Sequence, residues 1–342
     1  MRRLMIYVLV TAVLVGSFGP NMVSFASDGC LVALDVPNCK YGLPAAEYDA
    51  LLAAMQANPA PAVQQIGVDP EEVRRWSFWK IDGKGVTLYD SPGGIALGQT
   101  DPGFSFVTPK SRVEGWFEIE PGQWVSQSNL SGTRASSFTG VMLGGLPFPM
   151  AWILQPTRPS SVPGHRALKS TPLLPQYTRV YIYHTLRIGD WDWYLVGDGK
   201  WVEQRRVGMI KLHPNPPTGG RWVGVDLYEQ VMVAYEGGTP IFATLVSSGL
   251  RQWPTNEGLF KVWAKMNIDG MSGSMGKPDQ YDIPIVPYVM YFDGSKALHG
   301  AFWHNGFGYR RSHGCVNLSV GDAKWLFDFV SVDTPVLVWS SR

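Results

Sequence analysis

The segment "SHGCVNLSVGDAKWLF", from Ser312 to Phe327, places a single cysteine directly after a His-Gly pair and just before a predicted helix. Ser319 and Asp322 have the spacing of a helix-capping pair. Beyond them, apolar residues recur at helical spacing, at Ala323, Leu326, Phe327 and Val330. Cys315 is therefore expected in a loop that leads directly into a short helix.

Three of the six histidines, His299, His304 and His313, lie within 15 residues of sequence close to this thiol. A free thiol has a pKa of about 8.5, so a nucleophilic cysteine at neutral pH needs an imidazole to hold its thiolate. His299 closes an apparent strand, and Gly300 after it permits close approach of a backbone or a substrate. These residues predict that His299 is the base for Cys315.

The turn before Cys315 suggests an oxyanion pocket. The ring of His313 need not face the thiol, but the peptide N–H groups of His313, Gly314 and Cys315 could hold a developing negative charge. Two other interpretations stay open from these residues. Cys315 could be a buried, inert thiol, or it could be a metal ligand with His299, His304 and His313. The paired-ligand spacings of structural zinc sites are not found in the rest of the domain.

Upstream of the cysteine, apolar and other residues alternate with a period of two from residue 221 to residue 249. Three strands of a meander fit this alternation, with turns at Tyr228 to Gln230 and at Gly237-Gly238. The proline- and glycine-rich stretch before the meander predicts a linker over residues 214–220. Residues 221–342 are therefore expected to form the last domain.

Farther upstream, an aromatic hairpin occurs twice. The pattern from Trp116 to Gln127 recurs from Trp193 to Gln204 at a constant offset of 77 residues, each copy with a Gly turn before Trp-Val. The copies resemble bacterial SH3-like domains, which are small β-barrels, and the resemblance places them at residues 76–133 and 175–213. The proline-rich stretch between them, residues 134–174, predicts an extended connector.

The amino terminus has two arginines, an apolar run and small residues up to Ala26, which predicts a cleaved secretory signal over residues 1–26. The apolar run is shorter than the ~20 residues of a membrane span, which disfavours an uncleaved anchor. Residues 27–75 then contain one predicted helix, with an apolar face formed by Tyr48, Leu51, Leu52 and Met55. Because disulfides persist outside the cytoplasm, Cys30 and Cys39 are expected to pair, which leaves Cys315 either as an intermolecular link or as a thiol kept free for reaction.

The composition supports a folded, mainly β protein. Apolar residues make up 45% of the chain and charged residues only 17%, which argues against disorder. The formal net charge of +1 argues against a polyanion-binding surface, so nucleic acid is not an expected partner. The 38 glycines and 26 prolines favour short strands joined by turns over long helices.

The residues around Cys315 resemble a known family. "LHGAFW" followed by "SHGCVNLSVGDAKWLF" is similar to the L,D-transpeptidase (YkuD-type) catalytic domain, whose signature is a histidine, a loop, then Ser/Thr-His-Gly-Cys-hydrophobic-Asn/Arg. Ser312 to Asn317 fit all six of these places. The resemblance extends from Trp222 to Trp339, with "PTNEGLF" where the family more often has Thr-Pro. The loop after His299 is a little short, and His304 is an additional histidine.

The resemblance implies a β-rich, sandwich-like catalytic domain that cuts and rejoins peptidoglycan stem peptides. Cys315 would attack the carbonyl of the third residue in a tetrapeptide stem, release D-Ala and form a thioester. An amine of a neighbouring stem, or of another wall component, would then complete a 3→3 cross-link. His299 would transfer the protons, and Ser312 and Asn317 would order the loop. Further substrate contacts are expected from Tyr291, Trp303 and His304, and no metal or organic cofactor is required.

Two competing functions use the same sequence features. Water in place of the amine would make the protein an L,D-carboxypeptidase, and an inactive catalytic domain would leave a wall-binding scaffold. The predicted signal places the protein in the cell envelope or wall, outside the membrane. By analogy, the SH3-like modules are expected to bind the wall there.

Overall fold

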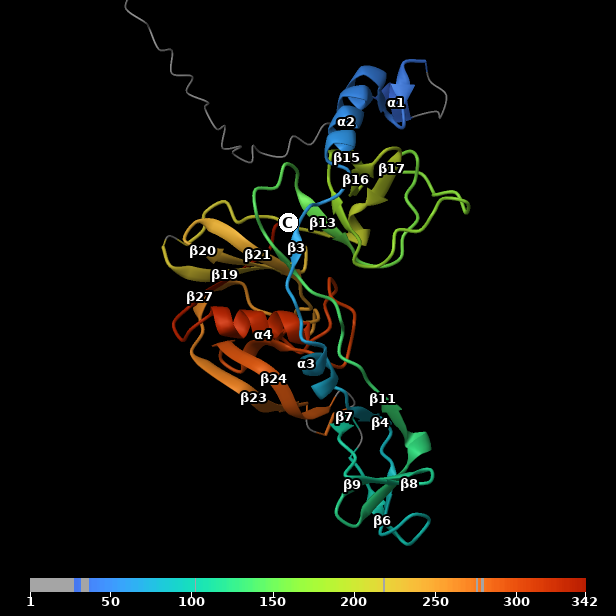
Figure 1. Cartoon of the computed structure of the whole chain (residues 1–342), viewed down its shortest axis with the longest axis vertical. Coiled ribbons are helices and arrows are strands. Elements are labelled where there is room, and N and C mark those ends of the chain that lie inside the picture. Colours follow the sequence, from blue (N-terminus) through green and yellow to red (C-terminus); the bar gives the residue numbers. More distant parts are fainter. Residues whose placement is uncertain (1–27, 32–36, 102, 218, 275, 278–279) are drawn as a thin grey trace, which may run out of the picture.

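The structure is a computed structural model, and it describes all residues except 1–27, 32–36, 102, 218, 275 and 278–279. The predicted signal, residues 1–26, lies outside the described residues. The described chain forms a central β-rich domain with a small β-module toward each end of the molecule (Figure 1). Within this described part, no helix is long and apolar enough to cross a membrane.

The first sheet of the central domain contains the predicted meander. Its three antiparallel strands lie where the alternation predicts them, and the turns fall at residues 227–230 and 237–238. The last strand of the chain runs parallel to the first meander strand, with Val336 opposite Val223. The strands are β19 (Arg221–Asp226), β20 (Val231–Glu236), β21 (Thr239–Leu245), β22 (Gly258–Lys261) and β27 (Pro335–Trp339).

The second sheet carries the residues around Cys315. Its strands are β23 (Ala264–Gly273), β24 (Tyr281–Asp293), β25 (Lys296–Gly300) and β26 (Val316–Leu318). The first three are antiparallel neighbours, whereas β25 and β26 run parallel. A parallel pair needs a crossover, and residues 301–315 supply it. This crossover contains the whole signature segment up to the cysteine.

Helix α4 (Val320–Phe329) begins shortly after Cys315, as predicted. The Ser319 hydroxyl accepts the capping hydrogen bond from the Asp322 N–H at 3.2 Å. Ala323 and Leu326 are fully buried in a core that also contains residues of both sheets. Figure 1 shows α4 between the two sheets. The mainly β, sandwich-like fold class is therefore confirmed.

The two β-modules share part of their strand order, and strands β5 and β6 of the first have no counterpart in the second. In the first, β4 pairs with both β7 and β11; in the second, β13 pairs with both β14 and β18. The repeated hairpin and the 3-10 turn after it occupy equivalent places in both. The first module contains β4 (Trp79–Ile81), β5 (Thr87–Tyr89), β6 (Ala96–Gln99), β7 (Phe104–Val107), β8 (Ser111–Val113), β9 (Trp116–Glu120), β10 (Gln123–Ser126), η1 (Gln127–Asn129) and β11 (Leu130–Gly132). The second contains β13 (Met150–Ile153), β14 (Arg179–Tyr181), β15 (His184–Ile188), β16 (Trp191–Gly197), β17 (Lys200–Glu203), η2 (Gln204–Arg206) and β18 (Val207–Met209).

The predicted connector, residues 134–174, is not simply an extended linker. Its residues Met150–Ile153 are β13, the central strand of a three-stranded sheet, and Val141–Met142 are strand β12 of the central domain. The prolines flank β13 and do not interrupt it, so its N–H groups remain available for pairing. The second module therefore begins before residue 175. The likeness of both modules to SH3 barrels stays a prediction.

The amino-terminal segment contains more than the one helix predicted for it. Helix α2 (Ala45–Ala57) is that helix, and α1 (Asp28–Leu31) and α3 (Pro70–Arg75) are additional. Cys30 and Cys39 form a disulfide. The short strands are β1 (Cys39–Lys40), β2 (Leu43–Pro44) and β3 (Gln64–Gln65). The described residues of the predicted linker 214–220 contain neither helix nor strand.

The predicted domain boundaries do not separate the sheets. Strand β7 of the first module pairs with β24, with Phe104 opposite Tyr281. Strand β12 pairs with β21 on one side and with β3 on the other, so that both extend the first sheet. Backbone hydrogen bonds thus run from the flanking segments into both sheets of the central domain.

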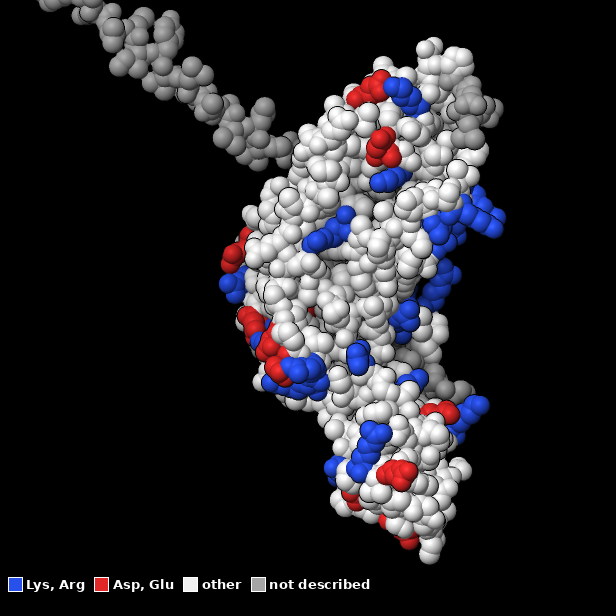
Figure 2. All heavy atoms as spheres, turned by 45° about the vertical axis from the view of Figure 1, so that its right-hand side comes forward, with Lys and Arg blue, Asp and Glu red and all other residues white. Residues whose placement is uncertain are grey.

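Charge is unevenly distributed on the surface. Figure 2 shows a mostly uncharged face on which blue Lys and Arg side chains occur along the right-hand edge, from the upper module to the central domain, without red ones between them. The charged residues are few, as the composition indicates, but they are not mixed evenly.

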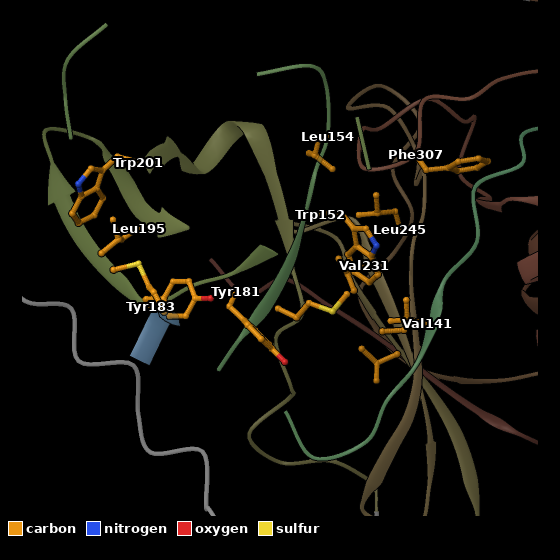
Figure 3. Close-up of a cluster of buried hydrophobic side chains, with 14 of the residues drawn as sticks. Val141, Trp152, Leu154, Tyr181, Tyr183, Leu195, Trp201, Val231, Leu245 and Phe307 are labelled. Carbon is orange, nitrogen blue, oxygen red and sulfur yellow. The ribbon is translucent and has the colours of Figure 1, made fainter. Parts of the chain in front are cut away.

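The second module and the central domain share one hydrophobic core. Figure 3 shows Trp152 of the module beside Val231 and Leu245 of the first sheet. Trp152 is 1% exposed and Leu245 is fully buried. Phe307, from the crossover that precedes Cys315, belongs to the same cluster. Packing of this module therefore reaches the segment that carries the signature residues.

Candidate active site

Cys315 and His299 are brought together by the parallel strands β25 and β26. His299 lies opposite Asn317 in this pair, and Cys315 is two residues before Asn317. Because directly paired residues point to the same face of a sheet, His299 and Asn317 share one face, and Cys315 lies just before β26. All three line one cavity of about 500 Å³. The imidazole of His299 and the thiol of Cys315 therefore belong to the lining of one cavity.

The protonation of His299 suits a base. Its side chain is buried, and Nδ1 lies 3.1 Å from the Gly300 carbonyl oxygen. A carbonyl can only accept, so Nδ1 carries the proton and Nε2 of the neutral ring keeps its lone pair. Burial lowers the pKa of His299 to about 4, although the Gly300 carbonyl opposes the shift. The ring is therefore neutral and able to accept a proton at pH 7.

The surroundings of Cys315 keep it a thiol in the resting state. Burial raises the pKa of Cys315, and this is only partly offset by the Ala297 backbone and by the nearby ammonium of Lys296. A thiol with a raised pKa is a weak nucleophile by itself at pH 7. Proton transfer to His299 would then accompany attack.

The turn before Cys315 is held by its own hydroxyl groups. The Ser312 hydroxyl donates to the Cys315 carbonyl at 2.5 Å and accepts from the Gly314 N–H at 3.1 Å. The Gly314 N–H is therefore occupied by Ser312 in this structure, and its role as an oxyanion donor stays a prediction. Thr255 fixes the turn from outside, because its hydroxyl donates to the Gly314 carbonyl at 2.8 Å. Gly314 has a φ of +121°, which favours glycine at this position.

The ring of His313 is packed between aromatic side chains. Its centroid lies 4.0 Å from that of Trp253 and 4.9 Å from that of Tyr281. His313 and Tyr281 both line the cavity that Cys315 also lines. His313 thus forms part of the cavity wall, where its ring packs at a tilt against both aromatic rings.

His304 has a definite partner that the signature does not specify. The Gly306 N–H donates to His304 Nδ1 at 3.2 Å, so the proton of the neutral ring is on Nε2. Nε2 lies 3.2 Å from the Asn317 side-chain amide, whose other end, Oδ1, has no partner. The Asn317 amide nitrogen and the protonated Nε2 of His304 are both donors and cannot bond each other. The stable orientation of the Asn317 amide is therefore the flipped one, in which Oδ1 accepts a hydrogen bond from His304 Nε2. Burial lowers the pKa of His304 to about 3, with a smaller contribution from Arg311.

Two predicted site residues have other positions. Tyr291 is not among the described residues that line the cavity; its hydroxyl donates to Asp269 at 2.8 Å and its ring stacks on Trp263. Gly300 is likewise not among the described residues that line the cavity, and a Cβ there would lie 2.9 Å from Pro287 Cγ. Trp303 and His304 do line the cavity, and their contact with substrate stays a prediction. Among the described residues, no group of three or more His, Cys, Asp and Glu side chains is placed to hold a metal ion.

Several cavity residues could not be recognised in sequence. Tyr281 and Met271 come from neighbouring strands of the second sheet, and Lys80 and Phe104 come from the first module. No motif connects these four residues. The pairing of β7 with β24 joins the first module, with Lys80 and Phe104, to the second sheet. Thr255 was within reach of sequence reasoning, since it belongs to the "PTNEGLF" segment.

Comparison with known proteins agrees with this geometry. Residues 220–338 match the family model described as the L,D-transpeptidase catalytic domain. L,D-transpeptidase 1 of Mycobacterium tuberculosis is 29% identical over 166 residues, which cover 44% of this chain and 66% of that protein. The chain thus spans slightly less than two thirds of this relative's length.

Solved structures of similar proteins were also found. The L,D-transpeptidase of Stackebrandtia nassauensis is 28% identical, with 37% of this chain and 59% of that chain covered and a TM-score of 0.31. The catalytic domain of the L,D-transpeptidase from E. faecium is 32% identical, with 36% of this chain and 100% of that chain covered and a TM-score of 0.33.

Proposed function

Residues 220–338 belong to the L,D-transpeptidase catalytic domain family, and on that premise we propose that the chain is an exported L,D-transpeptidase that forms 3→3 peptidoglycan cross-links. The observation that carries the proposal is that Cys315 and the buried, neutral His299 line the same cavity. The donor is a tetrapeptide stem, and the acceptor is an amine of a second stem or another wall component.

In the acylation step, His299 Nε2 takes the thiol proton as Cys315 Sγ attacks the carbonyl carbon of the third stem residue. The C–N bond to D-Ala then breaks, and the proton passes from His299 to the leaving amine. A thioester remains on Cys315. In the second step, the acceptor amine attacks this thioester, gives a proton to His299 and releases the thiol. Since the Gly314 N–H is occupied, oxyanion stabilisation from this turn rests on the Cys315 N–H.

Export is supported by two features. The predicted signal precedes the described chain, and the Cys30–Cys39 disulfide fits an oxidising compartment. Cys315 can remain reduced there because the other two cysteines are already paired. The substrate of the proposed reaction is found in the same compartment.

Wall binding is proposed for the second module. A cavity between its long loop and its hairpin is lined by the exposed Arg158, Arg166 and Arg206, next to Trp193. None of these three arginines forms an ion pair with another described residue. Glu203, which lines the same cavity, pairs with Arg205 instead. Net charge is an average over the chain, so it did not reveal this local cluster. Carboxylates of the peptidoglycan stems are the ligands proposed here.

The reaction is tested with the chain lacking residues 1–26, a tetrapeptide donor and an amine acceptor, with products identified by mass spectrometry. We expect D-Ala and a 3→3 dimer in equal amounts, and neither product from the Cys315→Ala variant. Tripeptide without dimer, at saturating acceptor, would show the carboxypeptidase instead. Turnover by Cys315→Ala would contradict the thioester route altogether.

Wall binding is tested by sedimentation with isolated peptidoglycan sacculi. The full chain is used, because the module shares a core with the central domain and need not fold alone. Replacing Arg158 and Arg206 by Ser should release the protein into the supernatant at a lower salt concentration than the wild type. Replacing the exposed Arg74 and Arg75 of α3 by Ser is the control. Equal retention of both variants would remove this site from consideration.

A further inference from the structure

The cavity beside Cys315 is not formed by the central domain alone. Lys80, Gly83, Gly103 and Phe104 of the first module line it, opposite His304 and Arg311 of the crossover. The family match covers residues 220–338 and therefore does not include this wall. The first module completes the cavity into which a substrate would have to bind.

The wall is fixed in place by backbone contacts. The Phe104 N–H donates to the Gln280 carbonyl at 2.9 Å, and β7 continues the second sheet beside β24. At Gly103 the two segments are so close that a Cβ would lie 2.6 Å from the Gln280 carbonyl oxygen. Gly103 N–H also donates to the Gly83 carbonyl at 3.0 Å, which ties the lining loop to its own module.

Aromatic packing fixes the same wall from behind. Phe106 of β7 lies 5.1 Å from Phe302 and 6.2 Å from Trp303, measured between ring centroids. Phe78 of the module and Phe302 of the crossover are both buried in one cluster. Trp303 itself lines the cavity, so the packed interface and the substrate space share a residue. The module is therefore not free to turn away from the cavity without breaking this core.

Lys80 supplies a positive charge to the cavity. Its ammonium lies 5.0 Å from the centroid of the Phe104 ring, a cation–π contact. Lys80 forms no ion pair with another described residue. The described residues that line the cavity also include no Asp or Glu. Arg311 adds a second cation on the crossover side, with its Nε donating to the Gly306 carbonyl at 3.1 Å. A cation at the mouth of a peptide-binding cavity favours an anionic peptide.

We propose that Lys80 binds a carboxylate of the donor peptide, so that the first module is part of the substrate site and sets its preference for anionic stems. This inference rests on the proposed function. Lys80 presents a compact charge that suits a single carboxylate, and the Phe104 ring beneath it gives the aliphatic part of the same residue an apolar surface. The carboxylate has two possible sources, the terminal D-Ala and the side chain of a diaminopimelate at the third position.

The test compares the full chain without residues 1–26 with its Lys80→Met variant, using D-Ala release from tetrapeptides. The loss of one charge-assisted contact should raise KM by about 10- to 100-fold with little change in kcat. Lys80→Arg should recover most of the affinity. Lys84→Met is the matched control, since Lys84 is exposed in the same module and does not line the cavity.

Amidated donors identify which carboxylate is bound. With the donor whose recognised carboxylate is amidated, the wild type and Lys80→Met should have equally high KM values. With the donor amidated at the other carboxylate, the KM of Lys80→Met should still exceed that of the wild type. An unchanged KM for Lys80→Met with every donor would overturn the inference.

The rate of Cys315 alkylation by iodoacetamide, a neutral reagent, should be the same in wild type and Lys80→Met. A wild type that alkylates normally but releases no D-Ala would instead contradict the proposed function.

Discussion

At the scale of single residues, His299 determines the pH range of the proposed reaction. The pKa of His299 is lowered to about 4, so its ring can accept the thiol proton at any pH above that value. The pKa of Cys315 is raised, so the free thiolate becomes abundant only in alkaline solution. Acylation by the wild type should therefore decline only as pH falls toward 4.

Replacing His299 by Ala should slow acylation by about 10²- to 10⁴-fold at pH 7, the usual contribution of a positioned proton acceptor. The deficit should shrink as pH rises through the thiol pKa, because the thiolate then forms without help. Stopped-flow measurement of acylation from pH 5 to pH 10 checks both statements. A deficit that stays constant over this range would show that His299 does not act on the thiol proton.

His304 is a positioning residue, because its contact is with Asn317 and not with the thiol. Removing it by His304→Ala should leave the Asn317 amide without its fixed orientation and slow acylation by about 10-fold. The pH profile should keep the wild-type shape. Asn317→Ala in the same background should add little, since both changes break one contact. A profile displaced like that of His299→Ala would assign His304 to proton transfer instead.

The buried ionisable groups also predict how stability depends on pH. Folding lowers the pKa of His299 from 6.5 to about 4 and the pKa of His304 from 6.5 to about 3. As pH decreases from 6.5 toward these values, the two histidines bind protons in the unfolded chain but not in the folded one. Stability is therefore lost as pH decreases through this window. The pKa of Asp322 rises from 3.8 to about 6, which acts in the opposite direction. Tm measured from pH 4 to pH 8 should fall toward acid, and less steeply in His299→Gln.

At the scale of elements, the packing of β25 against β24 and α4 positions His299. A Cβ on Gly300 would lie 2.9 Å from Pro287 Cγ and 3.3 Å from Ala323 Cβ, so these elements would have to separate slightly. Gly300→Ala should lower the free energy of unfolding by about 1–3 kcal/mol, the usual effect of overpacking. It should also reduce acylation, since His299 is the preceding residue. Denaturant titration and acylation rates measure the two effects.

The control for this variant is Gly144→Ala. A Cβ at Gly144 would have no atom within 4 Å, and the residue is exposed. Its effect on the free energy of unfolding should be within about 0.5 kcal/mol, as for most surface substitutions. Equal stability of the two variants would mean that the elements around Gly300 adapt without cost.

At the scale of the whole molecule, the flanking segments stabilise the central domain. Strands β7, β12 and β3 extend its two sheets, and Trp152 packs into a core shared with Val231 and Leu245. We expect the chain without residues 1–26 to unfold in one main calorimetric transition. A fragment of residues 221–342 should have a clearly lower Tm and should bind an apolar dye, because it exposes this core. The same Tm for fragment and full chain would show that the contacts contribute nothing.

The sequence by itself determined the local features of this protein. Ser319, Asp322 and the apolar residues after them specify helix α4, alternation specifies the meander, and the 77-residue repeat marks the two hairpins, because each depends on residues close together in the chain. The signature likewise placed Cys315 in a turn before the helix. These predictions needed no knowledge of long-range contacts.

Only the tertiary structure decided what surrounds that turn. Lys80 and Phe104 reach the cavity because β7 joins β24, a pairing between segments far apart in the chain. Met150–Ile153 became a central strand because its apolar side chains found a core to enter, although prolines on both sides suggested a linker. His304 can orient Asn317 only because the fold places the two side chains in contact. Pairing and burial between distant segments leave no periodicity in sequence, and for that reason these features could not be predicted from it.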